Sequence, residues 1–89
     1  MKYNLYAVRD SKANYFWQPQ PDLNDAVAKR GFAMMINSSD LKSITGFAPG
    51  DFDLYNIGTF DSDSGVVEAT IPCVFVCNGR SVLEVKDEK

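Results

Sequence analysis

Basic and aromatic side chains gather in the first third of the chain. Residues 1–30 contain five Lys or Arg against three Asp, a net charge of +2, whereas residues 31–89 carry a net charge of −5. The residues of this N-terminal group are Arg9, Lys12, Lys29 and Arg30 together with Tyr6, Tyr15, Phe16 and Trp17. Such mixtures bind single-stranded nucleic acid, because bases stack on rings while cations contact phosphates. Aromatic residues in a small sheet more often form its core, so the pattern alone leaves both interpretations open.

The total charge argues against one class of nucleic-acid binder. The chain has a net charge of −3. Strong, nonspecific binding to duplex DNA depends on neutralising many phosphates with Lys and Arg. A net-acidic chain is poorly suited to that role, although a local basic surface remains compatible with the composition.

The residues that usually carry catalysis or bind metals are missing or wrongly spaced. The chain has no His, so the commonest general base and metal ligand are absent. Cys73 and Cys77 lie four residues apart, which is not the spacing of a C-x-x-C redox or zinc pair. Asp61 and Asp63 resemble the start of a calcium loop, but its later ligands are lacking. We therefore expect no enzyme activity, no cofactor, no metal and no disulfide, with both cysteines as buried free thiols.

Length and composition describe one small domain spanning residues 1–89. The chain is 45% hydrophobic and 24% charged, which is sufficient for a core. No apolar run approaches the roughly 18–20 residues that span a bilayer, and no signal peptide is recognisable, so the expected location is the cytoplasm without membrane contact. So small a chain exposes much of its surface, and strands near both chain ends could leave a sheet edge open. These features predict a homodimer.

The local patterns predict strands at the N-terminus followed by one helix. Residues 3–9 form the first expected strand and 15–17 the second, which Pro19 and Pro21 should end. A helix is expected over residues 22–37, with Asp22 as its N-cap and Asn24 as the alternative cap. Lys29 and Arg30 fall on its solvated side. The residues expected to face the core are Leu23, Val27, Ala28, Gly31, Phe32, Met34, Met35 and Ile36, with Gly31 permitting a close approach.

The second half of the chain predicts loops and hairpins. Residues 41–50 are loop-like, with one helical turn that includes Leu41, Ile44 and Phe47. Strands at 52–60 and 66–71, joined by the polar turn 61–65, form the clearest hairpin, and Pro72 should end it. A second hairpin is expected over residues 73–85, with Asn78-Gly79 as its turn, and residues 86–89 should fray. The fold class is therefore α+β, a mainly antiparallel sheet with one principal helix packed on one face.

Several segments in order resemble the small nonstructural protein of gokushovirus-type microviruses, which are bacteriophages with single-stranded DNA genomes. The matching blocks are L-Y-A-V-R-D-S-K-A at residues 5–13, Phe16 with a following proline, Arg30-Gly31-Phe32, Asp51-Phe52 after a proline, L-Y-N-I-G-T-F-D at 54–61, Gly65 and Pro72. The resemblance spans residues 3–72 and does not extend over 73–85. Members of that family often have an aromatic residue where this chain has Arg9.

The resemblance implies a non-enzymatic protein that binds single-stranded DNA in the cytoplasm of the infected bacterium. Its implied role in replication is to switch phage DNA synthesis from duplexes to genomic single strands. It transfers no established binding residue, so the candidate binding set is the N-terminal group without Phe16: Arg9, Lys12, Lys29, Arg30, Tyr6, Tyr15 and Trp17. The alternative is an interaction or assembly module that contacts a viral replication protein, a capsid protein or a host factor.

Overall fold

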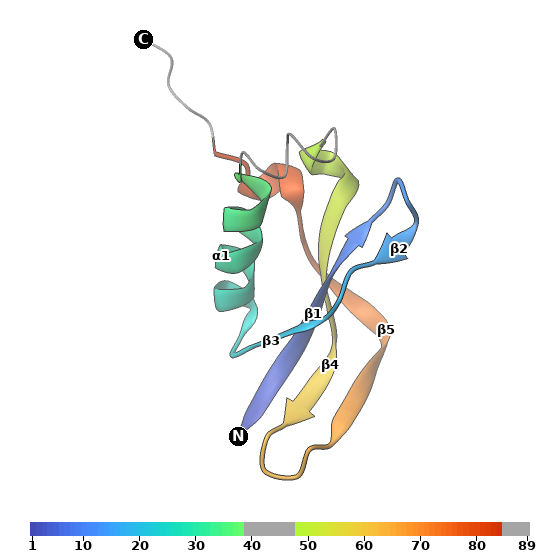
Figure 1. Ribbon diagram of the computed structural model, residues 1–89, viewed down its shortest axis with the longest axis vertical. Helices are drawn as coiled ribbons and strands as arrows, with labels where there is room; N and C mark the ends of the chain where they lie inside the picture. Colours follow the sequence, from blue (N-terminus) through green and yellow to red (C-terminus); the bar gives the residue numbers. More distant parts are fainter. Residues whose placement is uncertain (39–47, 85–89) are drawn as a thin grey trace.

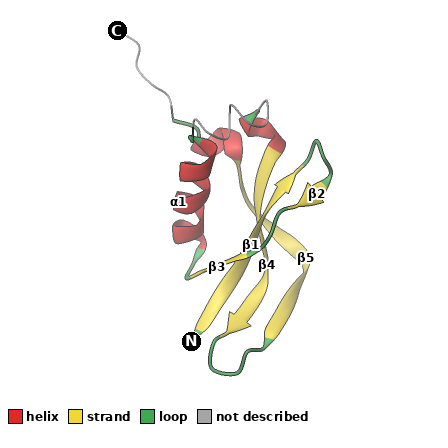
Figure 2. Ribbon diagram, viewed as in Figure 1, coloured by secondary structure: helices red, strands yellow, loops and turns green. Residues whose placement is uncertain are grey.

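The computed structural model describes residues 1–38 and 48–84, which contain five strands, one α-helix and two short 3₁₀ helices (Figures 1 and 2). In chain order the elements are β1 (Lys2–Asp10), β2 (Tyr15–Phe16), β3 (Gln20–Asp22), α1 (Asp25–Ile36), η1 (Pro49–Asp51), β4 (Phe52–Asp61), β5 (Val67–Asn78) and η2 (Gly79–Val82). The predicted α+β class, with a mainly antiparallel sheet and one principal helix, is confirmed.

All the strands belong to one antiparallel sheet with the order β2-β1-β4-β5. The N-terminal strand β1 is central: it pairs with β4 along its whole length and with β2 and β3 on its other side. The expectation that the N-terminal strand would leave an edge open is therefore wrong. The sheet edges are β5 on one side and the short strands β2 and β3 on the other.

Residues 19–21 do not simply end the second strand, as the two prolines suggested. The chain leaves β2, and β3 pairs with β1 through Asn4–Asp22, Leu5–Pro21 and Tyr6–Gln20. Proline cannot donate a ladder hydrogen bond, so it is tolerated in a sheet at an edge strand such as β3. The two prolines correctly predicted that β2 ends before residue 19, but they gave no sign that the following residues pair with β1 as β3.

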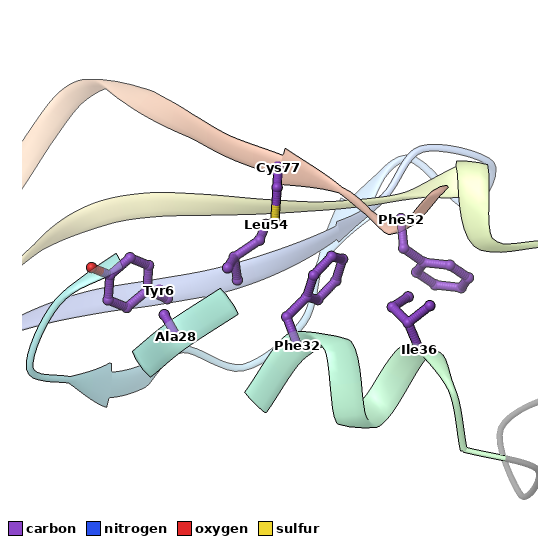
Figure 3. Packing of buried hydrophobic residues seen from close by; sticks show 7 residues of the cluster. All are labelled: Tyr6, Ala28, Phe32, Ile36, Phe52, Leu54 and Cys77. Carbon is purple, nitrogen blue, oxygen red and sulfur yellow. The ribbon is translucent and has the colours of Figure 1, made fainter. Parts of the chain in front are cut away.

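The core lies between α1 and one face of the sheet (Figure 3). Ala28, Phe32 and Ile36 point from α1 toward the strands, where they meet side chains of β1, β4 and β5. The sheet residues of this cluster are Tyr6, Phe52, Leu54 and Cys77. Ile36 is fully buried and Phe32 is 4% exposed. This three-residue stripe repeats every four positions, as expected for a helix with a single packed side.

The buried stripe of α1 is narrower than the sequence suggested. Leu23 is 52% exposed and Met34 is 71% exposed, and Gly31 is also exposed, with nothing within 4 Å of the position of an added Cβ. The expectation that Gly31 permits a close approach is therefore wrong. The N-cap is Asn24, the alternative to Asp22, because its side chain accepts a hydrogen bond from the Val27 N–H. The helix thus begins at Asp25 and ends at Ile36 instead of spanning 22–37.

Strand β5 continues through Pro72, where the sequence predicted an end. Register with β4 shifts between the pairs Asn56–Val74 and Gly58–Ala69, so residues 70–73 have no directly opposite partner. A proline fits there because β5 is an edge strand and the irregular stretch needs no N–H from it. The Ile71–Pro72 peptide bond is cis.

The predicted hairpin over residues 73–85 is wrong. Asn78 has a φ of −102°, whereas the two-residue turn expected at Asn-Gly needs positive φ at both positions. Its side-chain oxygen accepts a hydrogen bond from the Arg80 N–H, which caps η2, and its Nδ2 donates to the carbonyl of Gly50 at 3.0 Å. The apolar residues that follow, Val82 and Leu83, pack against the core instead of forming a strand.

Gly79 lies where η2 packs closely against η1 and the C-terminal end of α1. A Cβ at this position would collide with the carbonyl oxygen of Pro49 and lie 2.9 Å from the Cδ1 of Ile36. Only glycine allows η2 to approach η1 and the end of α1 so closely. The predicted helical turn with Leu41, Ile44 and Phe47 and the predicted fraying of 86–89 lie outside the described residues.

The core predicts a large stability loss for Phe32→Ala. Removing this ring leaves a cavity between α1 and β4, so the free energy of unfolding should fall by about 3–5 kcal/mol. The matched control is Met34→Ala on the exposed side of the same helix, which should change it by less than about 0.5 kcal/mol. Urea unfolding followed by circular dichroism measures both, and equal losses in the two variants would contradict this packing.

Candidate nucleic-acid interface

The two faces of the sheet differ in what covers them. Successive residues of a strand point to opposite faces. In β1, Tyr6 and Val8 contact the core beneath α1, so Arg9 and Ala7 point to the opposite side. No described element covers that side, which we call the open face.

Three rings form a row across the open face. Tyr55 of β4 is the direct partner of Ala7 and of Phe75, while Phe16 is the partner of Arg9. The ring centroids of Phe16 and Tyr55 are 5.6 Å apart and those of Tyr55 and Phe75 are 5.8 Å apart, both in edge-to-face contact. We call Phe16, Tyr55 and Phe75 the aromatic row. Phe16 is 43% and Phe75 is 55% exposed, so the row is open to solvent at both ends.

A second ring pair extends the open face along the strands. Tyr3 and Phe60 are direct partners on β1 and β4, and their rings stack with centroids 6.5 Å apart. Both side chains are half-buried. Rings on one face of an otherwise uncovered sheet offer flat apolar surfaces on which bases or other planar groups can stack.

Arg9 supplies positive charge beside the aromatic row. Its guanidinium donates a hydrogen bond to the Asn14 side chain in the β1–β2 turn, and its direct strand partner on β4 is Asp53. Among residues 1–38 and 48–84 the ion pairs join the Met1 ammonium group to Asp61 and Asp63, and none involves a Lys or Arg side chain. The charge of Arg9 is therefore available to an anionic group of a ligand.

The D-S-K-A block fixes the turn that carries Lys12. The Asp10 side chain accepts hydrogen bonds from the backbone N–H groups of Lys12 and Ala13, each at 3.1 Å. Ser11 ties the turn to η1, because its Oγ donates to the Asp51 carbonyl at 2.9 Å. Lys12 itself is exposed. The block therefore places Lys12 in the turn that directly follows β1, the strand that carries Arg9.

The candidate residues do not all share one surface. Lys29 and Arg30 are exposed on α1, which packs on the face opposite Arg9. Figure 1 shows α1 and the β1–β2 turn on different sides of β1. The single cationic face expected from the sequence is thus divided between the open face with its turn and the outer side of the helix.

The predicted stacking rings are also divided. Tyr6 is 2% exposed and belongs to the core, so its ring has no surface for stacking. Trp17 is half-buried and makes an edge-to-face contact with Phe52 at 5.3 Å, on the helix side of the sheet. Tyr15 is 57% exposed. It lines a shallow pocket beside Trp17 and Met35 of α1.

The candidate binding set contains none of the three rings in the row: Phe16 belonged only to the N-terminal group, and the sequence pattern missed Tyr55 and Phe75 altogether. Tyr55 and Phe75 lie far from the N-terminal basic residues, and only the pairing β1-β4-β5 brings them next to Phe16 and Arg9. Alternation along residues 52–60 was a signal that Tyr55 faces away from Phe52 and Leu54. For Phe75 no comparable signal existed, because the register of β5 shifts at its neighbours.

The other polar residues considered from the sequence have structural positions. The Asp61 side chain accepts a hydrogen bond from the Asp63 N–H at 2.9 Å, and such backbone hydrogen bonds hold the pKa of Asp61 below its usual value. Asp53 accepts a hydrogen bond from Asn78 at 2.7 Å. Cys77 is buried, which raises the pKa of its thiol, and Cys73 is half-buried; both are free. The described residues contain no group of three or more Cys, Asp or Glu placed to hold a metal, and no described helix is long and apolar enough to cross a membrane.

Comparison with protein families identifies a relationship over most of the chain. The family model described as "Phage ORF5 protein" matches residues 3–82, nearly the whole chain. Neither the curated proteins nor the solved structures yielded a match. The matched range includes α1, η2 and all of the sheet except Lys2.

The buried phenol of Tyr6 predicts a stability loss at high pH. Burial and the hydrogen bond from its hydroxyl to Asp25 raise the pKa of Tyr6 to about 12 from the usual 10.0. The folded state therefore holds this proton more tightly than the unfolded state. That contribution is complete below pH 10, where both states are protonated, and is lost as the pH rises through about 12.

Tyr6→Phe tests this prediction. The variant should lose about 1–2 kcal/mol at neutral pH, because the hydrogen bond to Asp25 is removed. Between pH 10 and 12 its free energy of unfolding should fall less steeply than that of the parent, measured by urea unfolding. Tyr15→Phe, at an exposed position, is the control. Parallel pH profiles for the parent and Tyr6→Phe would show that the Tyr6 phenol is not held in this way.

Proposed function

The chain belongs to the phage ORF5 protein family, and from this premise we propose that it binds single-stranded DNA on the open face during phage genome replication. The role is non-enzymatic, in the cytoplasm of the infected bacterium. The observation that carries the proposal is the aromatic row beside Arg9, on a face that no described element covers. The resemblance to the microvirus nonstructural protein supports the same role, as a switch toward single-strand synthesis.

In this proposal the aromatic rings bind the bases and the basic side chains bind the phosphates. Bases stack on Phe16 and Phe75, whose exposed ends are accessible, while Tyr55 holds the row together by edge contacts with both. Arg9 and Lys12 contact phosphates at the hairpin end of the row. Members of the microvirus family that the sequence resembles often have an aromatic residue where this chain has Arg9, and such a ring would lengthen the aromatic row. Duplex DNA binds less well, since its stacked bases cannot meet the rings.

A modest salt dependence follows from this small number of cations. Each phosphate contact contributes a slope of about −0.7 to a plot of log affinity against log salt for single strands. Two contacts, from Arg9 and Lys12, give a slope of about −1.4. Stacking should therefore supply much of the affinity, and binding should persist at salt concentrations that release a purely ionic binder.

Substitutions on the open face test the proposal. Phe16→Ala should weaken binding of a labelled oligothymidine about 5- to 150-fold, because a stacked base contributes about 1–3 kcal/mol. Arg9→Ala should weaken it and reduce the salt slope by about 0.7. Arg80→Ala, which removes an exposed cation on η2, is the charge-matched control and should bind as the parent does. Fluorescence anisotropy at several salt concentrations measures all of these.

The double variant Lys29→Ala/Arg30→Ala separates the two surfaces. The proposal expects it to retain the parent affinity. If it loses binding while Phe16→Ala and Arg9→Ala do not, the nucleic acid lies over α1 and the open face is not the site. If the parent binds no single strands at any salt concentration, the open face instead contacts a viral or host protein, the alternative role considered from the sequence.

A further inference from the structure

A groove lies between α1 and the segment that runs from β2 through β3, on the helix side of the sheet. It consists of two adjoining hollows of about 290 and 570 Å³. The residues that line both hollows are Val8, Gln18, Gln20 and Met35. The first hollow extends to Asp22 and Gly31, and the second extends to Phe16. We call the two hollows together the edge groove.

Gly31 keeps the edge groove open. Glycine in the middle of a helix is destabilising relative to alanine. No close contact requires it here, because nothing lies within 4 Å of the position of an added Cβ. A larger side chain at residue 31 would instead extend into the groove that this glycine lines. The space above α1 therefore accounts for a glycine that the packing of the core does not explain.

The walls of the edge groove suit a base and not a phosphate. Tyr15 and Trp17 line it from the sheet edge, and Met35 lines it from α1. Among the described residues in its walls, none is Lys or Arg, and Asp22 is acidic. Unstacked bases bind between aromatic and apolar side chains, whereas phosphates bind where Lys and Arg neutralise their charge.

Three polar side chains of the edge groove have no partner in the chain. Gln18, Gln20 and Asp22 line the first hollow. Among residues 1–38 and 48–84, none of these three side chains forms a hydrogen bond or an ion pair. Gln20 is the direct strand partner of Tyr6, whose side chain lies beneath α1, so Gln20 and Asp22 share that face of the sheet. Their polar atoms are available to the edge of a bound base.

The carboxylate of Asp22 discriminates among the four bases. A carboxylate accepts hydrogen bonds and donates none. Guanine is the one DNA base with two neighbouring donors, N1–H and the 2-amino group, which together match the two oxygens of a carboxylate. Thymine has a single N–H between two carbonyl oxygens, and these oxygens would face the negative charge. The amide groups of Gln18 and Gln20 can donate to the guanine carbonyl oxygen.

We propose that the edge groove binds one guanine base of the single strand that lies on the aromatic row. Phe16 connects the two surfaces, because its ring contacts Tyr55 in the row and also lines the groove. A strand stacked on the row turns around β2, and its next base enters the groove, where Asp22 accepts hydrogen bonds from N1–H and the 2-amino group. This inference rests on the proposed function and adds a base preference to it.

Oligothymidines that carry one replaced base test the proposal. Each strand competes with a labelled oligothymidine for the parent, and the replaced base is moved along the strand in turn. A single guanine at the best position should raise the affinity about fivefold or more, as expected for a bidentate contact to a base. Deoxyinosine has the same fused rings but lacks the 2-amino group, so it should lose most of this gain.

Two variants remove the guanine preference by different means. Gly31→Leu fills the groove, and it should fold because leucine favours a helix and the space is open. Asp22→Asn removes one of the two acceptor oxygens. Both should abolish the gain from guanine and still bind all-thymine strands on the open face. Ala26→Leu, at an exposed position elsewhere on α1, and Glu84→Gln, an exposed acid outside the groove, are the matched controls and should keep the gain.

Three results would overturn the guanine site. Equal affinity of the parent for guanine-containing and all-thymine strands would leave the proposed function standing without this site. A gain that persists in both Gly31→Leu and Asp22→Asn would place the selective contact elsewhere. Free dGMP that competes as well as the guanine-containing strand would show that the groove serves a free nucleotide. If the parent binds no strand at all, the proposed function itself fails, and this inference fails with it.

Discussion

The structure depends on one constraint: a single twelve-residue helix packs on only one face of the sheet. Ala28, Phe32 and Ile36 form the stripe that α1 buries, and Tyr6, Phe52, Leu54 and Cys77 receive it. Nothing else among the described elements lies on the other side of β1, β4 and β5. The rings that point there pack against one another in edge-to-face and stacked contacts, and they remain partly exposed. The core and the candidate binding surface are thus two consequences of the same packing.

The blocks that carry the family resemblance serve mainly to build turns and close contacts. Asp10 and Ser11 hold the β1–β2 turn and tie it to η1. In the block at 54–61, Gly58 faces the backbone carbonyl of Glu68 on β5, where any Cβ would collide, and Asp61 organises the following turn. These residues bring Lys12, Tyr55 and Phe60 into position through contacts within the chain. The same blocks also contain Arg9, Lys12, Phe16 and Tyr55 of the open face and its turn, so they combine scaffold residues with proposed binding residues.

Local patterns predicted the elements, whereas long-range pairing decided the surfaces. The alternating run in β1, the polar turn after β4 and the apolar spacing of α1 each determine one element, and these predictions are close to the observed bounds. Two predictions were wrong because tertiary contacts outweighed the local structural preference of a residue. Pro72 lies within an edge strand, and the Asn78 side chain caps η2 and binds η1 instead of turning a hairpin. The residues of the candidate binding set lie on different surfaces for a related reason. Tyr6 and Arg9 belong to the same strand, β1, but their side chains point to opposite faces of the sheet, so Tyr6 lies in the core and Arg9 on the open face.

The most direct test is to identify the aromatic side chains whose environment changes when single-stranded DNA is added. Aromatic side-chain NMR signals of the labelled chain, titrated with a short oligothymidine, report on each ring separately. We expect the ring signals of Phe16 and Phe75 to shift with a common dissociation constant, while those of Phe32 and Phe52 in the core stay in place. Shifts confined to the signals of α1, or none at saturating oligonucleotide, would contradict binding on the open face.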